Sequence, residues 1–456
     1  MRAPIDPAAL DQARAERRAR IVSLVRPFQQ FMHTEASSGI AIISAVMLAL
    51  IAANTPLSDL YEDFIHYHIA VDVGFFHLDT DLKHWVNDGL MVLFFFVVGM
   101  EIKREVVAGE LSGGRKGWAP VAGAAGGMIV PVIIFLALVE GDTAREGWAI
   151  PMATDIAIAV GVLTLVGSRV PPGLKVLLLA LAIVDDIGAI AVIAVFYTDN
   201  IDLAALGITV ALLGLVLLMN FNGIKLVPLY VAVGLAAWMA AHESGVHPTI
   251  LGVALGLMTP LQPWYRSTAL PDLAEALLSR IRARESAPDD DEVAHHERVG
   301  ALLTLSNLSE QAVSPLDRIE HRLLPWSAFL IVPLFAFVNA GVDLRGGVFE
   351  DAMSSSLALG VGLGLLLGKP IGATLATWIA VRLGAELPAG VTWPGVAGVG
   401  LIAGIGFTVA LFVTELSFDD PALLAQAKVG IFIASVVAAL GGLAVMRFLV
   451  PVHEEA

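Results

Sequence analysis

The sequence predicts an all-α polytopic membrane protein with about twelve transmembrane helices and one small outer β-hairpin. First, 57% of the 456 residues are hydrophobic and only 15% are charged, whereas an ordinary soluble domain carries about 25% charged residues. Second, apolar runs recur at the length of about 20 residues that an α-helix needs to cross a bilayer. Third, the loops between these runs alternate between basic and acidic, which indicates alternating sides of a membrane.

The expected spans are counted from the apolar runs, in chain order. They lie near 38–54, 84–102, 118–139, 148–167, 174–197, 204–220, 224–241, 247–260, 325–341, 355–382, 394–414 and 427–449. The eighth run is short, so it is tilted, re-entrant or extended into its flanks.

Orientation follows from the lysines and arginines of the short loops, which favour the cytoplasmic side. The basic positions are Lys103, Arg104, Arg115 and Lys116 after span two, Arg169 and Lys175 after span four, and Lys225 after span six. The alternate loops are acidic, as at Glu415, Asp419 and Asp420 after span eleven. We therefore expect both termini to be cytoplasmic.

The chain divides into an Arg-rich cytoplasmic leader at 1–35, a transmembrane domain at 36–447 and a cytoplasmic tail at 448–456. A cleaved signal peptide is the alternative interpretation of the amino-terminal end. The absence of cysteine excludes disulfides, thiol catalysis and cysteine metal sites. The formal net charge of −16 argues against nucleic acid as a partner.

Two segments of the transmembrane domain are not spans. Residues 67–80 alternate apolar and polar side chains around a glycine, which is typical of a β-hairpin; an ordered loop is the alternative. Residues 261–324 form a long cytoplasmic loop with amphipathic helices near 270–284 and 296–312. The acidic run between these helices, at 287–292, is a solvated segment or else a partner-binding or membrane-surface one.

The candidate site begins with two adjacent aspartates, Asp185 and Asp186, in the middle of the apolar run 177–197. A carboxylate at the centre of a transmembrane helix costs about 2.5 kcal/mol or more. Intramembrane ionisable groups therefore indicate an ion or proton pathway. Adjacent residues on a helix point about 100° apart, so the two carboxylates face different neighbours.

One cation is buried at a comparable depth. Lys369 lies about fourteen residues into span ten, directly before a proline. A lysine this deep either extends its side chain to the membrane interface or pairs with a carboxylate. Pairing with one of the two aspartates is the interpretation that we favour.

Two spans contain helix-breaking residues. Span four has Pro151 ahead of Thr154 and Asp155, and span eleven has several glycines ahead of Thr408. Interrupted segments in corresponding positions of two halves are the best sequence indication of a transporter site. Close helix packing is the alternative interpretation of a glycine-rich span, and Asp155 favours the functional one for span four.

Six motifs carry a family resemblance. They are FFFVVGMEIKRE (94–105), REGWAIPMATDIAIAVGVL (145–163), LALAIVDDIGAI (179–190), VPLFAFVNAG (332–341), LLLGKP (365–370) and GIGFT (404–408). Together, and in this order, they resemble the NhaA family of bacterial sodium/proton antiporters, over about residues 36 to 447. The departures are a longer leader, a longer 261–324 loop and Leu324 where some members have histidine.

The resemblance implies inverted repeats of spans three to five and ten to twelve, with spans four and eleven unwound where they cross. It implies that Asp155 and Asp186 line the ion site, that Thr154 lies nearby and that Asp185 pairs with Lys369. It also implies a homodimer, held partly by the hairpin. The residues Glu101, Arg104, Glu105 and Glu320 match the family's pH-response region; anchoring of the cytoplasmic helix ends is the equal alternative.

The expected function is electrogenic exchange of Na⁺, and of Li⁺, for H⁺ across the bacterial inner membrane, in pH and sodium homeostasis. Asp186 is one proton carrier, and the second is Asp155 or the Asp185–Lys369 pair. We expect no cofactor and no enzymatic activity. The alternatives are a proton-coupled symporter, a cation channel and, least of all, an intramembrane aspartyl protease, for which the buried lysine is unexpected.

Overall fold

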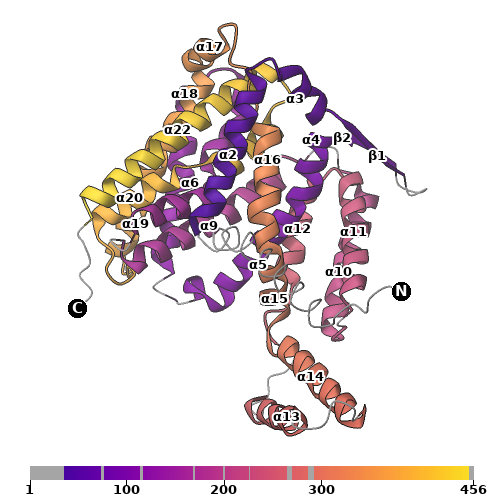
Figure 1. Ribbon diagram of the computed structural model, residues 1–456. Helices are drawn as coiled ribbons and strands as arrows, with labels where there is room; N and C mark the ends of the chain where they lie inside the picture. The colour runs from indigo at the N-terminus through magenta and orange to yellow at the C-terminus, as the bar shows by residue number, and fades with distance from the viewer. Residues whose placement is uncertain are drawn as a thin grey trace, which may run out of the picture. The chain divides into compact units, whose positions relative to one another are not determined.

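The computed structural model describes residues 35–72, 77–112, 114, 117–167, 170–198, 201–224, 226–263, 270–285 and 292–450. These residues are mostly helical, with one two-stranded sheet (Figure 1). Several expectations lie outside the described residues. They are the basic leader up to residue 34, the hairpin turn at 73–76, the acidic run up to residue 291, the tail from residue 451, and the loop cations Arg115, Lys116, Arg169 and Lys225.

The chain divides into two compact units, and the first comprises the described residues up to Met91, Ala108–Thr198 and those from Ala328 on. Its helices are α2 (Glu35–Ala53), α3 (Ser58–Ile65), α4 (Leu82–His84), α6 (Trp118–Leu138), α7 (Asp142–Arg145), α8 (Ile156–Leu165), α9 (Pro172–Phe196), α16 (Val332–Ala340), α17 (Val348–Ser354), α18 (Ser356–Leu363), α19 (Lys369–Arg382), α20 (Trp393–Ala403), α21 (Phe407–Ser417) and α22 (Pro421–Phe448). Tighter or wider helical turns occupy Trp85–Leu90, Glu110–Ser112, Glu146–Met152 and Gly364–Gly368.

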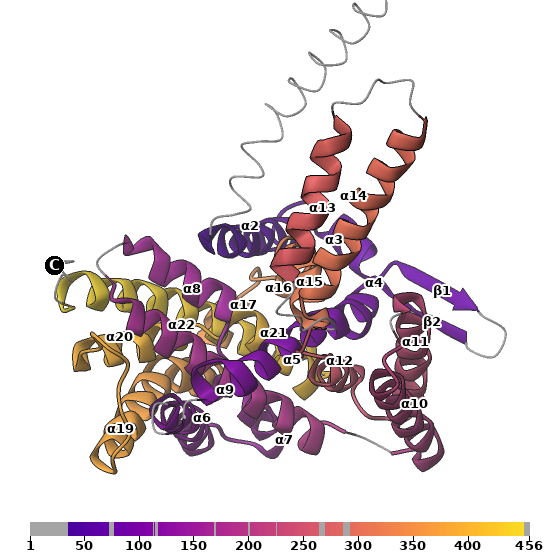
Figure 2. The same ribbon diagram turned by 90° about the horizontal axis from the view of Figure 1, so that it is seen from below.

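The second unit comprises Val92–Val107 and the described part of Asp199–Ser327. Its helices are α5 (Met91–Ala108), α10 (Leu203–Phe221), α11 (Val227–Glu243), α12 (Pro248–Met258), α13 (Leu270–Glu285), α14 (Glu292–Ala312) and α15 (Pro315–Trp326), which leads into a π-helical turn at Ser327–Ile331. The helices α10 and α11 lie side by side, as do α13 and α14 (Figures 1 and 2).

Each expected span coincides with helical structure. In the described ranges, six helices are long and apolar enough to cross a membrane, or nine if each of three bent helix pairs is one span. The remaining expected spans, two, seven and eight, correspond to α5, α11 and α12, which are shorter or more polar. The chain is therefore a helical multi-pass membrane protein.

Three boundaries differ from the expectation. The helix expected to begin at residue 325 begins at Pro315, so the long loop ends at Ser314, whose hydroxyl caps α15. Span one is followed by the separate helix α3, bent by 119° from α2. Glu415, expected in an acidic outer loop, lies inside α21. Each missed segment is polar or amphipathic, so the apolar pattern did not mark it.

The expected hairpin is confirmed as an antiparallel pair of β1 (His68–Asp72) and β2 (His77–Asp81). Its strands begin and end within a residue or two of the expected range 67–80. The Trp85 indole N–H donates a hydrogen bond to the Ile69 carbonyl, which attaches the hairpin to the helical turn that follows it. Acidic and histidine side chains occupy the more exposed face, as in the His68–Asp79 pair.

Small residues bring α6 and α19 into backbone contact. A Cβ atom built on Gly126 would lie 2.2 Å from the Gly372 carbonyl oxygen, and one built on Gly372 would lie 2.1 Å from the Gly126 carbonyl oxygen. Only glycine permits this approach, as is usual at transmembrane helix crossings. The contact fixes α19, whose first residue is Lys369, against α6.

Candidate functional site

The two interrupted spans are confirmed as broken helices. In span four the helical segment Asp142–Met152, which ends in 3₁₀ turns, is bent by 47° from α8, and in span eleven α20 is bent by 43° from α21. The two breaks touch, because the Asp155 backbone N–H donates a 2.7 Å hydrogen bond to the Ile405 carbonyl. Broken backbone at membrane depth is tolerated where it is buried in protein or lines a cavity.

Asp155 links the two breaks through its side chain. It is 2% exposed and caps α8, with Oδ1 accepting the Ile158 backbone N–H at 3.0 Å. Its Oδ2 accepts the Thr408 hydroxyl at 2.6 Å and the Thr408 backbone N–H at 3.1 Å. One carboxylate therefore receives donors from the first turns of two helices, where the helix dipoles favour negative charge.

Thr408 contacts a candidate site residue, Asp155, and the sequence did not assign it to the site. Its position at the start of α21, just after the glycine-rich break, was the available signal, because first-turn N–H groups lack partners within their own helix. The contact with Asp155 joins positions 253 residues apart, so no local pattern predicts it.

A second polar group surrounds Lys369, which is fully buried together with Asp185. The Lys369 ammonium donates to Asp185 Oδ2 at 2.5 Å and to the Thr154 hydroxyl oxygen at 2.9 Å. The Thr154 hydroxyl lies 2.8 Å from the same carboxylate oxygen and 2.9 Å from the Ala403 carbonyl. Its single proton serves one of these two acceptors.

Lys369 therefore does not reach the membrane interface, and the expected contact with Asp185 is present. The π-helical turn Gly364–Gly368 comes directly before Lys369. Among the described residues, Asp185 Oδ1 has no hydrogen-bond partner although it is buried. Such an oxygen is costly unless it is protonated or meets water or an ion.

Asp186 lies on the same helix, is 4% exposed, and faces a different direction from Asp185. The short contact to Lys369 is made by Asp185. Asp155, Asp185 and Asp186 together with Lys369 are thus three buried carboxyl groups and one buried ammonium group, with a formal charge of −2 when all four are ionised. Carboxylate and carbonyl oxygens are the ligands that suit hard metal cations.

The pH-response candidates belong to the second unit. Arg104 Nη1 lies 2.6 Å from Glu320 Oε1, and the Glu320 side chain is 7% exposed. Glu101 interacts electrostatically with both of these residues. Glu105 is half-buried on the same helix, α5. The structure therefore brings Glu101, Arg104 and Glu320 together.

A further buried ion cluster joins three elements of the first unit. Glu415 on α21 forms two ion pairs. Its Oε2 lies 2.7 Å from Lys83 Nζ, and its Oε1 lies 2.7 Å from Lys428 Nζ. The Glu415 and Lys428 side chains are 10% and 6% exposed. Lys428 is the second residue of the expected span twelve. A lysine inside an apolar span indicates a buried partner of opposite charge, and this was the available sequence signal for the cluster.

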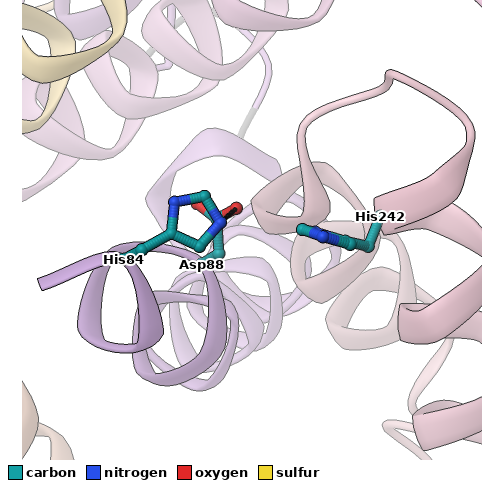
Figure 3. Close-up of side chains that lie close together, drawn as sticks. All are labelled: His84, Asp88 and His242. Atoms are coloured by element: carbon teal, nitrogen blue, oxygen red, sulfur yellow. Dashed lines mark ion pairs between the residues drawn. The ribbon is translucent and has the colours of Figure 1, made fainter. Parts of the chain in front are cut away.

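Two described histidines make short contacts with nearby polar side chains. His84 and Asp88 form an ion pair at 3.1 Å across one helical turn (Figure 3). His242, also drawn there, lies on α11 in the second unit. The His247 ring lies 2.8 Å from the Thr249 hydroxyl at the start of α12.

Comparison with known proteins identifies relatives along nearly the whole chain. Residues 29–446 match the model of the family described as Na⁺/H⁺ antiporter 1. The chain is 45% identical over 428 residues to Na(+)/H(+) antiporter NhaA 2 of Sorangium cellulosum, covering 93% of this chain and 90% of that protein. It is 43% identical over 429 residues to Na(+)/H(+) antiporter NhaA of Rhodopirellula baltica, covering 94% and 95%.

A third relative, Na(+)/H(+) antiporter NhaA of Oleidesulfovibrio alaskensis, is 45% identical over 430 residues, again covering 94% of this chain and 95% of that protein. The matched region includes both broken helices, the aspartate pair and Lys369. The chain belongs to the Na⁺/H⁺ antiporter 1 family.

Proposed function

We propose that this protein exchanges Na⁺ for H⁺ across the bacterial inner membrane and takes up two protons for each sodium ion extruded. Family membership supports antiport of these two ions. The observation that carries the proposal is the contact of the two broken helices, which buries Asp155 and Thr408 in the unit that also buries the aspartate pair and Lys369.

Exchange follows from competition for the same oxygens. Burial away from water disfavours a charged carboxylate and so favours its protonated form. A sodium ion bound to the carboxylates would displace these protons, because the oxygen lone pairs serve only one cation at a time. We assign the sodium ligands to Asp155 and Asp186, with Thr154 nearby.

The second proton has two candidate sources. Asp155 would release one when its hydrogen bonds with Thr408 stabilise the carboxylate beside sodium. Alternatively, the Lys369 ammonium would release one if the ion pair with Asp185 opened on sodium binding. The unpartnered Oδ1 of Asp185 marks a position where a proton or ion would find an acceptor.

The uptake of two protons for each sodium ion extruded moves one net positive charge into the cell. Moving one charge across 100 mV is worth about 2.3 kcal/mol, which corresponds to roughly a fifty-fold concentration ratio. The membrane potential would therefore drive sodium extrusion, with lithium as a second transported cation, in sodium and pH homeostasis. No cofactor and no catalytic step enter this scheme.

We further propose twelve spans, with spans three to five and ten to twelve as inverted repeats, and cytoplasmic termini. The hairpin of β1 and β2 supports a homodimer, since a two-stranded sheet alone is only marginally stable in water. The Arg104–Glu320 pair, with Glu101 and Glu105, is the proposed pH-response region.

The test is sodium-driven proton movement in proteoliposomes, followed with a pH-sensitive dye. The wild type should dequench the dye on addition of sodium, and Asp186→Asn should not. Asp343→Asn, at an exposed loop aspartate, is the matched control and should behave as wild type. An imposed membrane potential should change the rate of sodium-driven proton movement. A rate that is independent of the potential would refute the proposed stoichiometry.

The same assay separates the alternatives. A cation channel would pass sodium down its gradient without proton counterflow. A proton-coupled symporter would leave the dye unchanged on addition of sodium and would respond to an organic substrate instead. Exchange that survives in Asp186→Asn would remove the aspartate pair from the site.

A further inference from the structure

A shallow apolar groove runs between α19 and α20 on the first unit. Its volume is about 560 Å³, and its walls are Pro370, Ile371, Thr374, Leu375 and Trp378 on α19 and Trp393 and Ala397 on α20. The α19 wall extends from Pro370 to Trp378, or about 12 Å at 1.5 Å per residue.

The groove lies on helices that belong to membrane-spanning segments. Residues Ser356–Arg382 form one candidate span, and α20 belongs to one of the bent pairs. The side chains of Ile371 and Leu375 are each 51% exposed, and that of Trp378 is 43% exposed. Large apolar side chains exposed at this depth meet hydrocarbon, so the matching occupant is an acyl chain.

One end of the groove carries a cation and two indoles. Arg382, the last residue of α19, lies one turn beyond Trp378, with its guanidinium 5.0 Å from the centre of the indole ring. Trp393 is the first residue of α20, so it marks the same end of the antiparallel pair. Tryptophan is enriched at the level of the lipid headgroups, and a basic side chain beside it favours an anionic headgroup.

We propose that this groove is a binding site for an anionic phospholipid, with one acyl chain between α19 and α20 and the phosphate at Arg382. The proposed orientation of the spans, on which this inference rests, puts Arg382 at the cytoplasmic leaflet, which carries the anionic lipids. The opposite end of the groove is Pro370, which directly follows Lys369. A bound chain would therefore pack against the helix turn that presents the buried ammonium group.

At the Pro370 end of the groove, α19 and α20 are in close contact. A Cβ atom on Gly400 would lie 2.8 Å from the Pro370 Cα atom, so the backbones of α19 and α20 approach closely at this end. The lipid would stay on the outer side of this contact, separated from the Asp185–Lys369 pair by α19 itself.

The test is native mass spectrometry of the purified full-length protein with equal amounts of phosphatidylglycerol and phosphatidylethanolamine that carry the same acyl chains. The wild type should retain the anionic lipid about fivefold better, which corresponds to the ~1 kcal/mol that one basic residue contributes near anionic lipid. Arg382→Gln should abolish this preference. Arg447→Gln, which removes the arginine in the last turn of α22, should keep it.

The groove is tested separately from the headgroup. Ala397→Trp fills the groove and should release the retained lipid of either type, and Ile371→Trp is a second filling variant at a more exposed position. Leu440→Trp adds the same bulk to an exposed apolar position on α22 and should retain lipid as wild type does. Equal retention of both lipids by the wild type, or retention unchanged in both filling variants, would refute the site. Because no transport is measured, these outcomes are independent of the exchange assay.

Discussion

Removing the ammonium group of Lys369 would isolate a buried charge. Lys369 and Asp185 are both fully buried, at an Nζ–Oδ2 distance of 2.5 Å. Breaking a buried ion pair by removing one partner typically costs about 3–5 kcal/mol, because the remaining charge is unpaired in a medium of low polarity. We therefore expect Lys369→Met, which keeps most of the side-chain volume, to lower the free energy of unfolding by about 3–5 kcal/mol.

The assay is reversible unfolding in mixed detergent micelles, with the double variant Asp185→Asn/Lys369→Met as the matched comparison. The double variant should lose much less stability, since replacing both members of a buried pair is often close to neutral. Protonation of Asp185 would remove the unpaired charge, so the deficit of Lys369→Met should be smaller at acidic than at alkaline pH. Equal stability of Lys369→Met and the wild type would refute the reasoning.

Three further predictions concern single contacts. Thr408→Val removes the hydroxyl group that donates a hydrogen bond to the Asp155 carboxylate. The lost hydrogen bond is worth about 1.5 kcal/mol or more, so the sodium concentration for half-maximal exchange should rise about tenfold. Thr408→Ser keeps the hydroxyl group and should leave this concentration unchanged. Gly372→Ala would force α6 and α19 apart and should destabilise by about 1–3 kcal/mol in thermal unfolding, whereas Gly441→Ala, with no atom within 4 Å of the new Cβ, should not. Hydrogen bonds from the Arg345 side chain lower the pKa of Asp343 from 3.8 to about 2. This exposed pair should stabilise the fold slightly above pH 4, and the gain should disappear as the pH falls towards 2. Unfolding midpoints measured at a series of pH values should therefore differ between the wild type and Asp343→Asn above pH 4. Equal midpoints for the two proteins at every pH would contradict this prediction.

The spans and the candidate carboxylates could be predicted because the membrane makes them conspicuous. An apolar run of about twenty residues is rare outside a membrane span, and Asp185, Asp186 and Lys369 stand out because a charge within such a run is costly. The breaks in spans four and eleven were visible because Pro151 and the glycines weaken the helix locally.

The rest depends on contacts between distant parts of the chain. Thr408 meets Asp155, and Lys83 meets Glu415, only because the helices pack as they do. The sequence pattern assigns Glu415 to a loop because a charged residue beside a span resembles an outer segment. Its burial depends on Lys83 and Lys428, which no pattern of neighbouring residues reveals.

The extra helical residues from Pro315 to Leu324 show a different limit. They alternate charged and apolar side chains, so they lack the continuous apolar run that marked the span after them. The helix start was signalled by Ser314 and Pro315, a capping residue followed by a proline in the first turn. These local signals are weaker than hydropathy in a chain of this composition.

The most direct test of the exchange site is the number of protons released when sodium binds to the purified protein. In weakly buffered detergent solution at a mildly alkaline pH, the wild type should release about two protons for each sodium ion bound, since both ions compete for the same buried carboxyl oxygens. Asp186→Asn should release fewer. Sodium binding with no proton release in the wild type would contradict the competition on which the account rests.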